Sequence, residues 1–196
     1  MKQIFSTLIL ILIFGISHGQ DSSAIKAFKN LCDSSGLQFT MPEGYNVIEV
    51  KRNRDLVYSF AAINADSTME IRYTIWSLKP QLEKYKESLK DSNSIMIPPN
   101  NLYKGIVQAN MLNMTGGKTY DIGSFSSKAV KKEFNADAGG SCFFKFHCHF
   151  GKGYKYGQFV YLHKDDVADV IVTFMSNNKD THADLMKVGF HSLKFK

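Results

Sequence analysis

The most constraining feature of the sequence is an alternating run over residues 69–76. Its odd-numbered positions are apolar or aromatic, and its even-numbered positions are mostly polar and end in Trp76. Because successive side chains of a β-strand point to opposite faces, the run predicts a strand with one buried face and one mostly wet face. Such a strand is typical of an antiparallel sheet. We expect a helix to cover the polar face where it carries Trp76.

Comparable runs predict further strands on both sides of a helical middle. The expected strands are residues 37–41, 45–51, 56–63, 142–149, 154–163 and 168–175. The expected helices are residues 22–33, a segment from Pro80 to Leu89, a segment from Tyr103 to Met114, a helix capped by Ser126 or Ser127, and a last helix opened by a capping box at Thr181. This order indicates an α+β fold, in which helices pack on the faces of an antiparallel sheet. No repeat or long linker divides the chain, so we expect one domain over residues 20–196.

Residues 1–19 have the organisation of a secretory signal peptide. Lys2 supplies a positive start, residues 8–14 form a short apolar core, and Ser17 and Gly19 put small residues before the expected cleavage point. The apolar core is short for a membrane span, although an uncleaved N-terminal anchor is the alternative. The first cysteine is Cys32, which lies too far along the chain for a bacterial lipid anchor. We therefore expect an exported protein, periplasmic or extracellular, with no stable membrane anchor after cleavage.

The charge and the cysteines fit export. The net charge of +6 weakly favours anionic partners, and we expect no nucleic-acid partner outside the cell. Export permits disulfides. Cys142 and Cys148 fall in one expected strand, roughly 20 Å apart at ~3.3 Å per residue, which is too far for a disulfide between them. Cys32 could pair with either one, or the thiols could all be free and buried.

Two short motifs resemble a known family. Residues 39–45 (FTMPEGY) are similar to the F-x-x-P-x-G-aromatic opening of the PsbP-like α/β/α sandwich superfamily, and residues 190–195 (FHSLKF) are similar to its x-x-S-hydrophobic-x-F ending. Residues 132–139 (KEFNADAG) also resemble a motif of exported Bacteroidetes proteins. The resemblance covers most of residues 37–196. It implies the sandwich fold and a role in binding or assisting other proteins, and it brings no shared catalytic residues.

Catalytic and metal motifs fail on their spacing. The GKT at residues 117–119 looks like the end of a P-loop, but the first Gly is missing and the segment follows a helix. Ser141 lacks the second Gly of a nucleophile elbow, and Cys142 shares its strand face with apolar residues that would make its thiol inert. The Asp-rich segments at residues 165–169 and 180–184 lack the spacing of a calcium loop. The sequence therefore implies no cofactor.

The strongest polar cluster is the pair His147 and His149. On one strand they would share a face with Lys145, and His163 at the end of the next strand could add a third nitrogen. Two imidazoles on one face can begin a metal site. The alternative is a set of polar residues on the wetter face, where Lys145 would repel a cation.

Lysines and tyrosines gather around the turn at residues 151–153. A basic surface with aromatic residues can hold an anionic ligand or an acidic partner, although such surfaces are more often only solvated. The candidate binding residues of the whole region are Lys145, His147, His149, Tyr154, Tyr156 and His163.

The sequence favours a non-enzymatic, exported binding or accessory protein of the bacterial envelope, whose partner is a protein or a small anionic ligand. The rival is a metal-dependent enzyme or metal-binding protein with a site assembled around His147, His149 and His163, because the residues of a catalytic site need to be adjacent only in space. A third possibility is a secreted surface-interaction protein with an exposed apolar patch or a free sheet edge.

Overall fold

The computed structural model describes residues 22–147, 149–151 and 153–196. The expected signal peptide and Cys148 lie outside the described residues. The strands are β1 Leu37–Phe39, β2 Tyr45–Val47, β3 Phe60–Asn64, β4 Met69–Ser77, β5 Gly123–Ser124, β6 Ala138–Lys145, β7 Tyr156–Lys164, β8 Ala168–Ser176 and β9 Leu193–Phe195. The helices are a first helix over residues 22–34, α2 Lys79–Ser88, α3 Tyr103–Thr115, α4 Ser127–Phe134 and α5 Lys179–Gly189, with short 3-10 turns η1 Pro99–Asn101 and η2 His149–Gly151.

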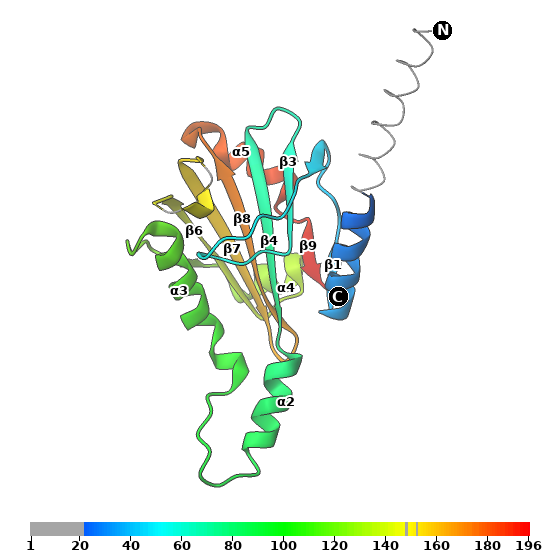
Figure 1. Cartoon of the computed structure of the whole chain (residues 1–196), viewed down its shortest axis with the longest axis vertical. Helices are drawn as coiled ribbons and strands as arrows, with labels where there is room; N and C mark the ends of the chain where they lie inside the picture. The colour runs from blue at the N-terminus through cyan, green and yellow to red at the C-terminus, as the bar shows by residue number, and fades with distance from the viewer. Residues whose placement is uncertain (1–21, 148, 152) are drawn as a thin grey trace, which may run out of the picture.

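Seven strands form one antiparallel sheet in the order β2-β3-β4-β8-β7-β6-β5, and β1 pairs with β9 in a separate ribbon (Figure 1). The long strands β4, β8 and β7 form its centre. Helices pack on both faces, so the α+β fold predicted from the order of the elements is confirmed.

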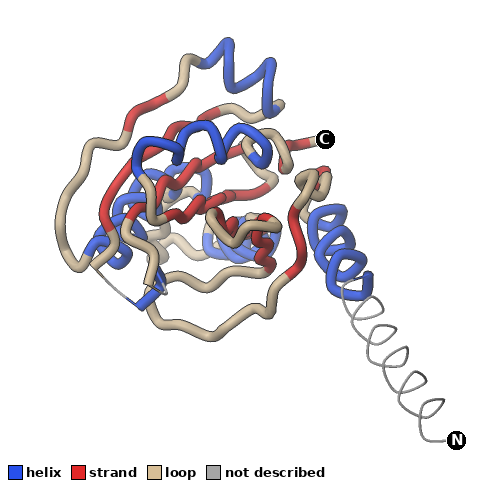
Figure 2. The backbone as a smooth tube through the Cα atoms, turned by 90° about the horizontal axis from the view of Figure 1, so that it is seen from above, coloured by secondary structure: helices blue, strands red, loops and turns tan. Residues whose placement is uncertain are grey.

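The first face of the sheet packs against the first helix, α4, α5 and the β1–β9 ribbon. Phe28 of the first helix stacks on Phe60 of β3, with ring centroids 4.5 Å apart. Phe39 of β1 meets Tyr73 of β4 edge-on at 5.3 Å. Both views place the first helix at one side of the sheet, next to β1 (Figure 2). This helix, which has no counterpart in the PsbP-like motifs, therefore completes the first core.

The second face is buried too, which corrects the expectation of a wet face on β4. α3 covers this face and buries Met111 against it, and residues 48–59 pack beside α3. Glu70, Arg72 and Thr74 are only 1%, 3% and 2% exposed. The alternation correctly predicted which side chains share a face. It did not predict burial, because polar side chains can be buried when their hydrogen-bonding groups find partners.

Capping residues set several helix ends. Ser126 caps α4 by accepting a backbone N–H with its hydroxyl, and Gly116 ends α3 at a φ of 63°, both in line with the sequence. α5 differs from the prediction. Asn178 caps it, accepting the Asp180 N–H at 2.9 Å, so the helix begins before the box predicted at Thr181.

Three predicted strands have other bounds than expected, and part of the chain predicted as strand lies outside the sheet. β2 ends at Val47 and β3 begins only at Phe60, which leaves residues 48–59 as a loop, here called the β2–β3 loop. β6 ends at Lys145. The chain after β6 meets the β2–β3 loop on the second face, where the Phe150 N–H donates to Asp55 Oδ2 at 2.9 Å.

α2 and the loop to α3 project beyond the end of the sheet (Figure 1). No residue of α2 is buried, so its apolar side chains do not join either core. Ile95, Met96 and Ile97 on the following loop are exposed as well.

Candidate functional site

Hydrogen bonds give the β2–β3 loop a fixed shape. The Lys51 N–H donates to the Tyr58 hydroxyl at 2.8 Å. Asn53 Oδ1 accepts the N–H groups of Asp55 and Leu56 at 3.0 and 2.9 Å, a local turn that Asn favours. Leu56 and Tyr58 are buried in the second core. The exposed part of the loop is therefore held between buried anchors.

Three cationic side chains stand on this loop: Lys51, Arg52 and Arg54. All three are exposed, and none forms an ion pair with a residue that the structure describes. They line a cleft of about 520 Å³. We call it the cationic cleft, and its lining is residues 51–55, Tyr58, Arg72 and His149.

Arg72 forms the buried side of the cationic cleft. Its Nε donates to Glu70 Oε1 at 2.7 Å, and its Nη1 donates to the Phe150 carbonyl at 2.5 Å. The rings of Tyr58 and Phe150 lie 4.7 and 4.5 Å from the guanidinium carbon, which adds cation–π attraction. A guanidinium has five N–H donors, so hydrogen bonds to the described residues leave donors for a ligand.

Tyr154 lies under the cleft beside this ion pair. Burial and, less strongly, the charge of Glu70 together raise the pKa of its hydroxyl to about 12, although the charge of Arg72 opposes the shift. The hydroxyl therefore remains protonated at neutral pH. Tyr154 therefore adds an uncharged group beside the buried pair.

Two further polar groups on the loop bear on ligand binding. Asn53 Nδ2 is buried and has no hydrogen-bond partner among the described residues. An unsatisfied buried donor costs about 1–3 kcal/mol, which a ligand oxygen would offset. Asp55 is the carboxylate of the cleft lining, and its Oδ2 is already engaged by the Phe150 N–H. The cleft therefore combines several cations and a free donor with a carboxylate that already has a partner.

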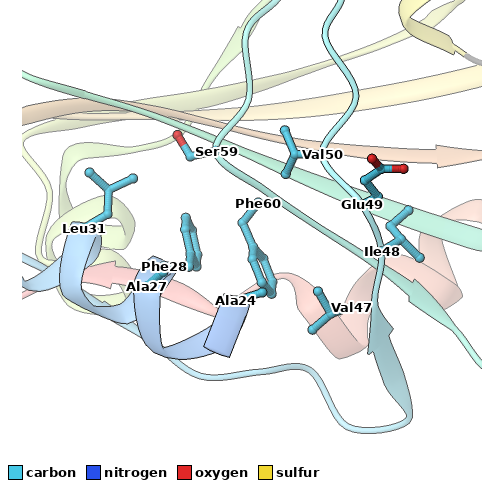
Figure 3. A pocket seen from close by; sticks show the side chains of 10 residues that line it. All are labelled: Ala24, Ala27, Phe28, Leu31, Val47, Ile48, Glu49, Val50, Ser59 and Phe60. Atoms are coloured by element: carbon cyan, nitrogen blue, oxygen red, sulfur yellow. The ribbon is translucent and has the colours of Figure 1, made fainter. Parts of the chain in front are cut away.

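An apolar groove of about 510 Å³ lies between the first helix and the start of the β2–β3 loop (Figure 3). The helix contributes Ala24, Ala27, Phe28 and Leu31 on one side. Residues 47–50 and 59–60 line the other side. We call this hollow the apolar groove.

The structure brings two of the sequence-predicted site residues to the cationic cleft. His149 lines it and Tyr154 lies beneath it. Lys145 and Tyr156 are register partners at the ends of β6 and β7. Tyr156 stacks on Phe143 at 5.9 Å, and Phe143 contacts α5 on the first face, so this pair lies across the sheet from the cleft.

His147 and His149 do not share a strand face, which corrects the expected pair. β6 ends at Lys145, so His147 lies in irregular chain beyond the strand and His149 begins the 3-10 turn η2. His147 Nε2 is 3.2 Å from Lys118 Nζ, a cation that opposes metal binding there. The described residues contain no group of three or more His, Cys, Asp or Glu that could hold a metal ion.

His163 belongs to a separate cluster and does not join the other histidines. It sits opposite Ala138, at the far end of β7 from Tyr156, about 23 Å away at ~3.3 Å per residue. Its Nδ1 lies 2.6 Å from Asp169 Oδ1 and its Nε2 lies 2.9 Å from Asp165 Oδ1.

The surroundings of His163 favour the charged form of its ring. Burial lowers its pKa, but the hydrogen bonds to Asp169 and Asp165 and the charges of these carboxylates outweigh burial, so the pKa is raised. The ring also stacks on Tyr103, with centroids 4.1 Å apart. With both nitrogens engaged by carboxylates, the ring offers no lone pair to a metal.

Cys32 and Cys142 are buried free thiols. Burial and the charge of Asp33 together raise the pKa of Cys32 to about 12. Burial and the charge of Asp121 together raise the pKa of Cys142 to about 11. Cys32 belongs to the first core and Cys142 to the second, so the sheet separates them. Both thiols are therefore poor nucleophiles.

Lys51, Arg52 and Arg54 are absent from the residues that the sequence predicts for a site. Lys51 ends one expected strand, and Arg52 and Arg54 lie between this strand and the next. The available signal was the density of charge, since three of the four residues 51–54 are cations. The sequence could not show that the loop after Arg54 packs against Arg72 through Tyr58.

No protein-family model matches the chain, and no curated protein matches its sequence. Among solved structures, the chain is similar to the solution structure of cyanobacterial PsbP (CyanoP) from Synechocystis sp. PCC 6803. The TM-score is 0.40 and the identity 11%, over 83% of this chain and 88% of that chain. Within the described part of the chain, no helix is both long and apolar enough to cross a membrane.

Proposed function

We propose that this protein is an exported, non-enzymatic binding or accessory protein of the bacterial envelope, and that its cationic cleft holds an anionic ligand. The observation that carries the proposal is the set of cations Lys51, Arg52 and Arg54, which lack ion-pair partners among the described residues and stand over the buried Arg72. A phosphate or carboxylate group suits these donors because guanidinium groups form charge-assisted, often bidentate, hydrogen bonds with both.

The shape of the site supports a binding role. Tyr58 and Asn53 hold the backbone of the loop, and Glu70 holds Arg72, so the loop backbone and the Arg72 guanidinium are ordered before a ligand arrives. Pre-ordering reduces the entropy cost of binding. The failure of every catalytic motif on spacing also favours binding over catalysis.

Export and family are parts of the same proposal. Lys2, the apolar residues 8–14 and the small residues Ser17 and Gly19 support a cleaved signal peptide. The motifs at residues 39–45 and 190–195 support membership of the PsbP-like superfamily.

Calorimetric titration of the purified protein with ethyl phosphate, at low ionic strength and pH 7, tests the anion site. We expect saturable binding to one site. The double variant Arg52→Gln/Arg54→Gln should weaken it by about tenfold or more, because hydrogen bonds to charged groups contribute about 1.5–3 kcal/mol each.

The matched control is Lys128→Gln/Lys132→Gln, which removes the same charge from exposed positions on α4. It should leave the affinity within about twofold. If both double variants weaken binding equally, net charge alone explains the binding and there is no specific site. If the unaltered protein gives no binding heat, the anion site is rejected.

A further inference from the structure

A third hollow lies next to both the apolar groove and the cationic cleft. Its lining is residues 50–54, Val57 and Tyr58, so it shares Val50 with the groove and residues 51–54 and Tyr58 with the cleft. The groove takes its lining from the first helix, residues 47–50 and residues 59–60, whereas the cleft takes its lining from residues 51–55 and Tyr58 of the loop, with Arg72 and His149. One ligand of suitable length could therefore lie in both hollows at once.

The groove lies at the edge of the sheet, where the β2–β3 loop and the first helix diverge. β2 and β3 pair only as far as Val47 and Ala62. Beyond this point the loop packs Leu56 and Tyr58 into the second core, while the first helix packs Phe28 on Phe60 in the first core. The hollow between them is framed by elements that are anchored in separate cores, so it does not depend on a mobile lid.

The lining of the groove leaves apolar surface in water. Leu31 and Val50 are 36% and 44% exposed, and Val57 farther along the loop is 74% exposed. Clustered exposed apolar side chains next to a hollow mark a binding site more often than single ones do. The lining includes one carboxylate, Glu49, which Figure 3 places on the loop side, across from the helix. An anionic group would therefore favour the cleft end over the groove.

We propose that the ligand is a monomeric amphiphile with a single alkyl chain and an anionic head group. This inference rests on the proposed anion site. The head lies among Lys51, Arg52, Arg54 and Arg72, and the chain runs past Val50 into the groove beside Phe28 and Phe60. Charge complementarity fixes the head at one end, and burial of methylene groups supplies most of the affinity.

A chain-length series of alkyl phosphates tests the inference by calorimetry. Ethyl, butyl, hexyl and octyl phosphate are titrated below the concentrations at which they form micelles. We expect the dissociation constant to fall about two- to fourfold per added methylene, because each buried CH₂ contributes up to about 0.8 kcal/mol. Octyl glucoside, with the same chain and no charge, should bind at least tenfold more weakly than octyl phosphate. Titration with sodium octanoate in the same assay shows whether the cleft prefers a carboxylate or a phosphate head group.

The variant Leu31→Asn removes apolar surface at an exposed position of the groove that does not line the cleft. It should flatten the dependence on chain length and leave ethyl phosphate binding unchanged. The series on the unaltered protein needs no variant, so the test holds even if this variant fails to fold.

The possible failures are distinct. If ethyl phosphate binds and octyl phosphate binds no more tightly, the anion site stands and the amphiphile inference is overturned. If octyl glucoside binds as well as octyl phosphate, the groove acts without the cleft and the inference is again overturned. If neither phosphate binds, the proposed function itself fails.

Discussion

The Arg72 Nε lies 2.7 Å from Glu70 Oε1, and the two side chains are only 4% and 1% exposed. The pair spans alternate positions of β4 and faces the second core, directly under the cationic cleft. Burying charge is unfavourable unless the partners are close and hydrogen-bonded, and Arg72 has both the carboxylate and the Phe150 carbonyl. The ion pair therefore holds the floor of the cleft in place.

The substitution Glu70→Gln should destabilise the fold strongly. It leaves the buried Arg72 without its carboxylate, and breaking one side of a buried pair costs about 3–5 kcal/mol. Urea unfolding followed by circular dichroism gives the free energy of unfolding. Glu87→Gln, which breaks the exposed pair with Lys90, is the control and should leave the midpoint unchanged. Equal small effects of the two substitutions would contradict this role for Glu70.

His163 should stabilise the fold more at acidic than at alkaline pH. Because its pKa is raised in the folded protein, its contribution is fully present below the unfolded pKa of about 6.5 and is lost as pH rises through the folded value. The measurement is the difference in unfolding free energy between the unaltered protein and His163→Gln at several pH values from 5 to 9. The difference should shrink as pH rises. A difference that is constant or grows would contradict the charged ring bound by Asp165 and Asp169.

His182 should have the opposite dependence on pH. Burial lowers its pKa to about 4, its Nδ1 lies 2.7 Å from the Ser176 hydroxyl, and its ring meets Phe143 edge-on. Between pH 6.5 and 4 the unfolded chain takes up a proton at this residue and the folded chain does not, so stability falls as pH falls. In His182→Gln the loss of stability over this range should be smaller than in the unaltered protein. An equal loss in both proteins would show that other groups cause it.

The two buried thiols should resist modification in the folded protein. Cys32 and Cys142 are 1% and 2% exposed, and their raised pKa values leave almost no thiolate at pH 8. The test uses a Cys148→Ser variant and a chromogenic disulfide reagent. No label should enter before unfolding, and two labels should enter in urea. Rapid labelling of the native variant would mean that one of the cores is open.

The sequence predicted those features of the fold that local chemistry determines. Alternation located the central strands, and Ser126 and Gly116 predicted helix ends correctly because caps act within one turn. Burial of Glu70 and Arg72 was beyond the pattern, because a strand's alternation does not reveal that a loop and α3 will cover its polar face. The end of β6 at Lys145 was also unpredicted, and with it the separation of His147 from a strand face.

The candidate site was harder to predict for the same reason. His149 and Tyr154 could be found in a region rich in aromatic and basic residues, but the cations of residues 51–54 come from a loop distant in sequence. Only tertiary packing brings Asp55 to the Phe150 N–H, and this contact places the β2–β3 loop and the chain after β6 beside Arg72. No periodicity along the chain encodes that contact.

The proposed anion site is formed by the β2–β3 loop together with Arg72. Its sharpest test is to follow amide and arginine NMR shifts during titration with ethyl phosphate. The predicted result is saturable shifts at the amides of residues 51–58 and at the Arg52, Arg54 and Arg72 Nε–H groups, with none at Lys128 or Lys132 on α4. Shifts of similar size at the α4 lysines, or an Arg72 Nε–H resonance that does not shift, would contradict a single site formed by the loop and Arg72.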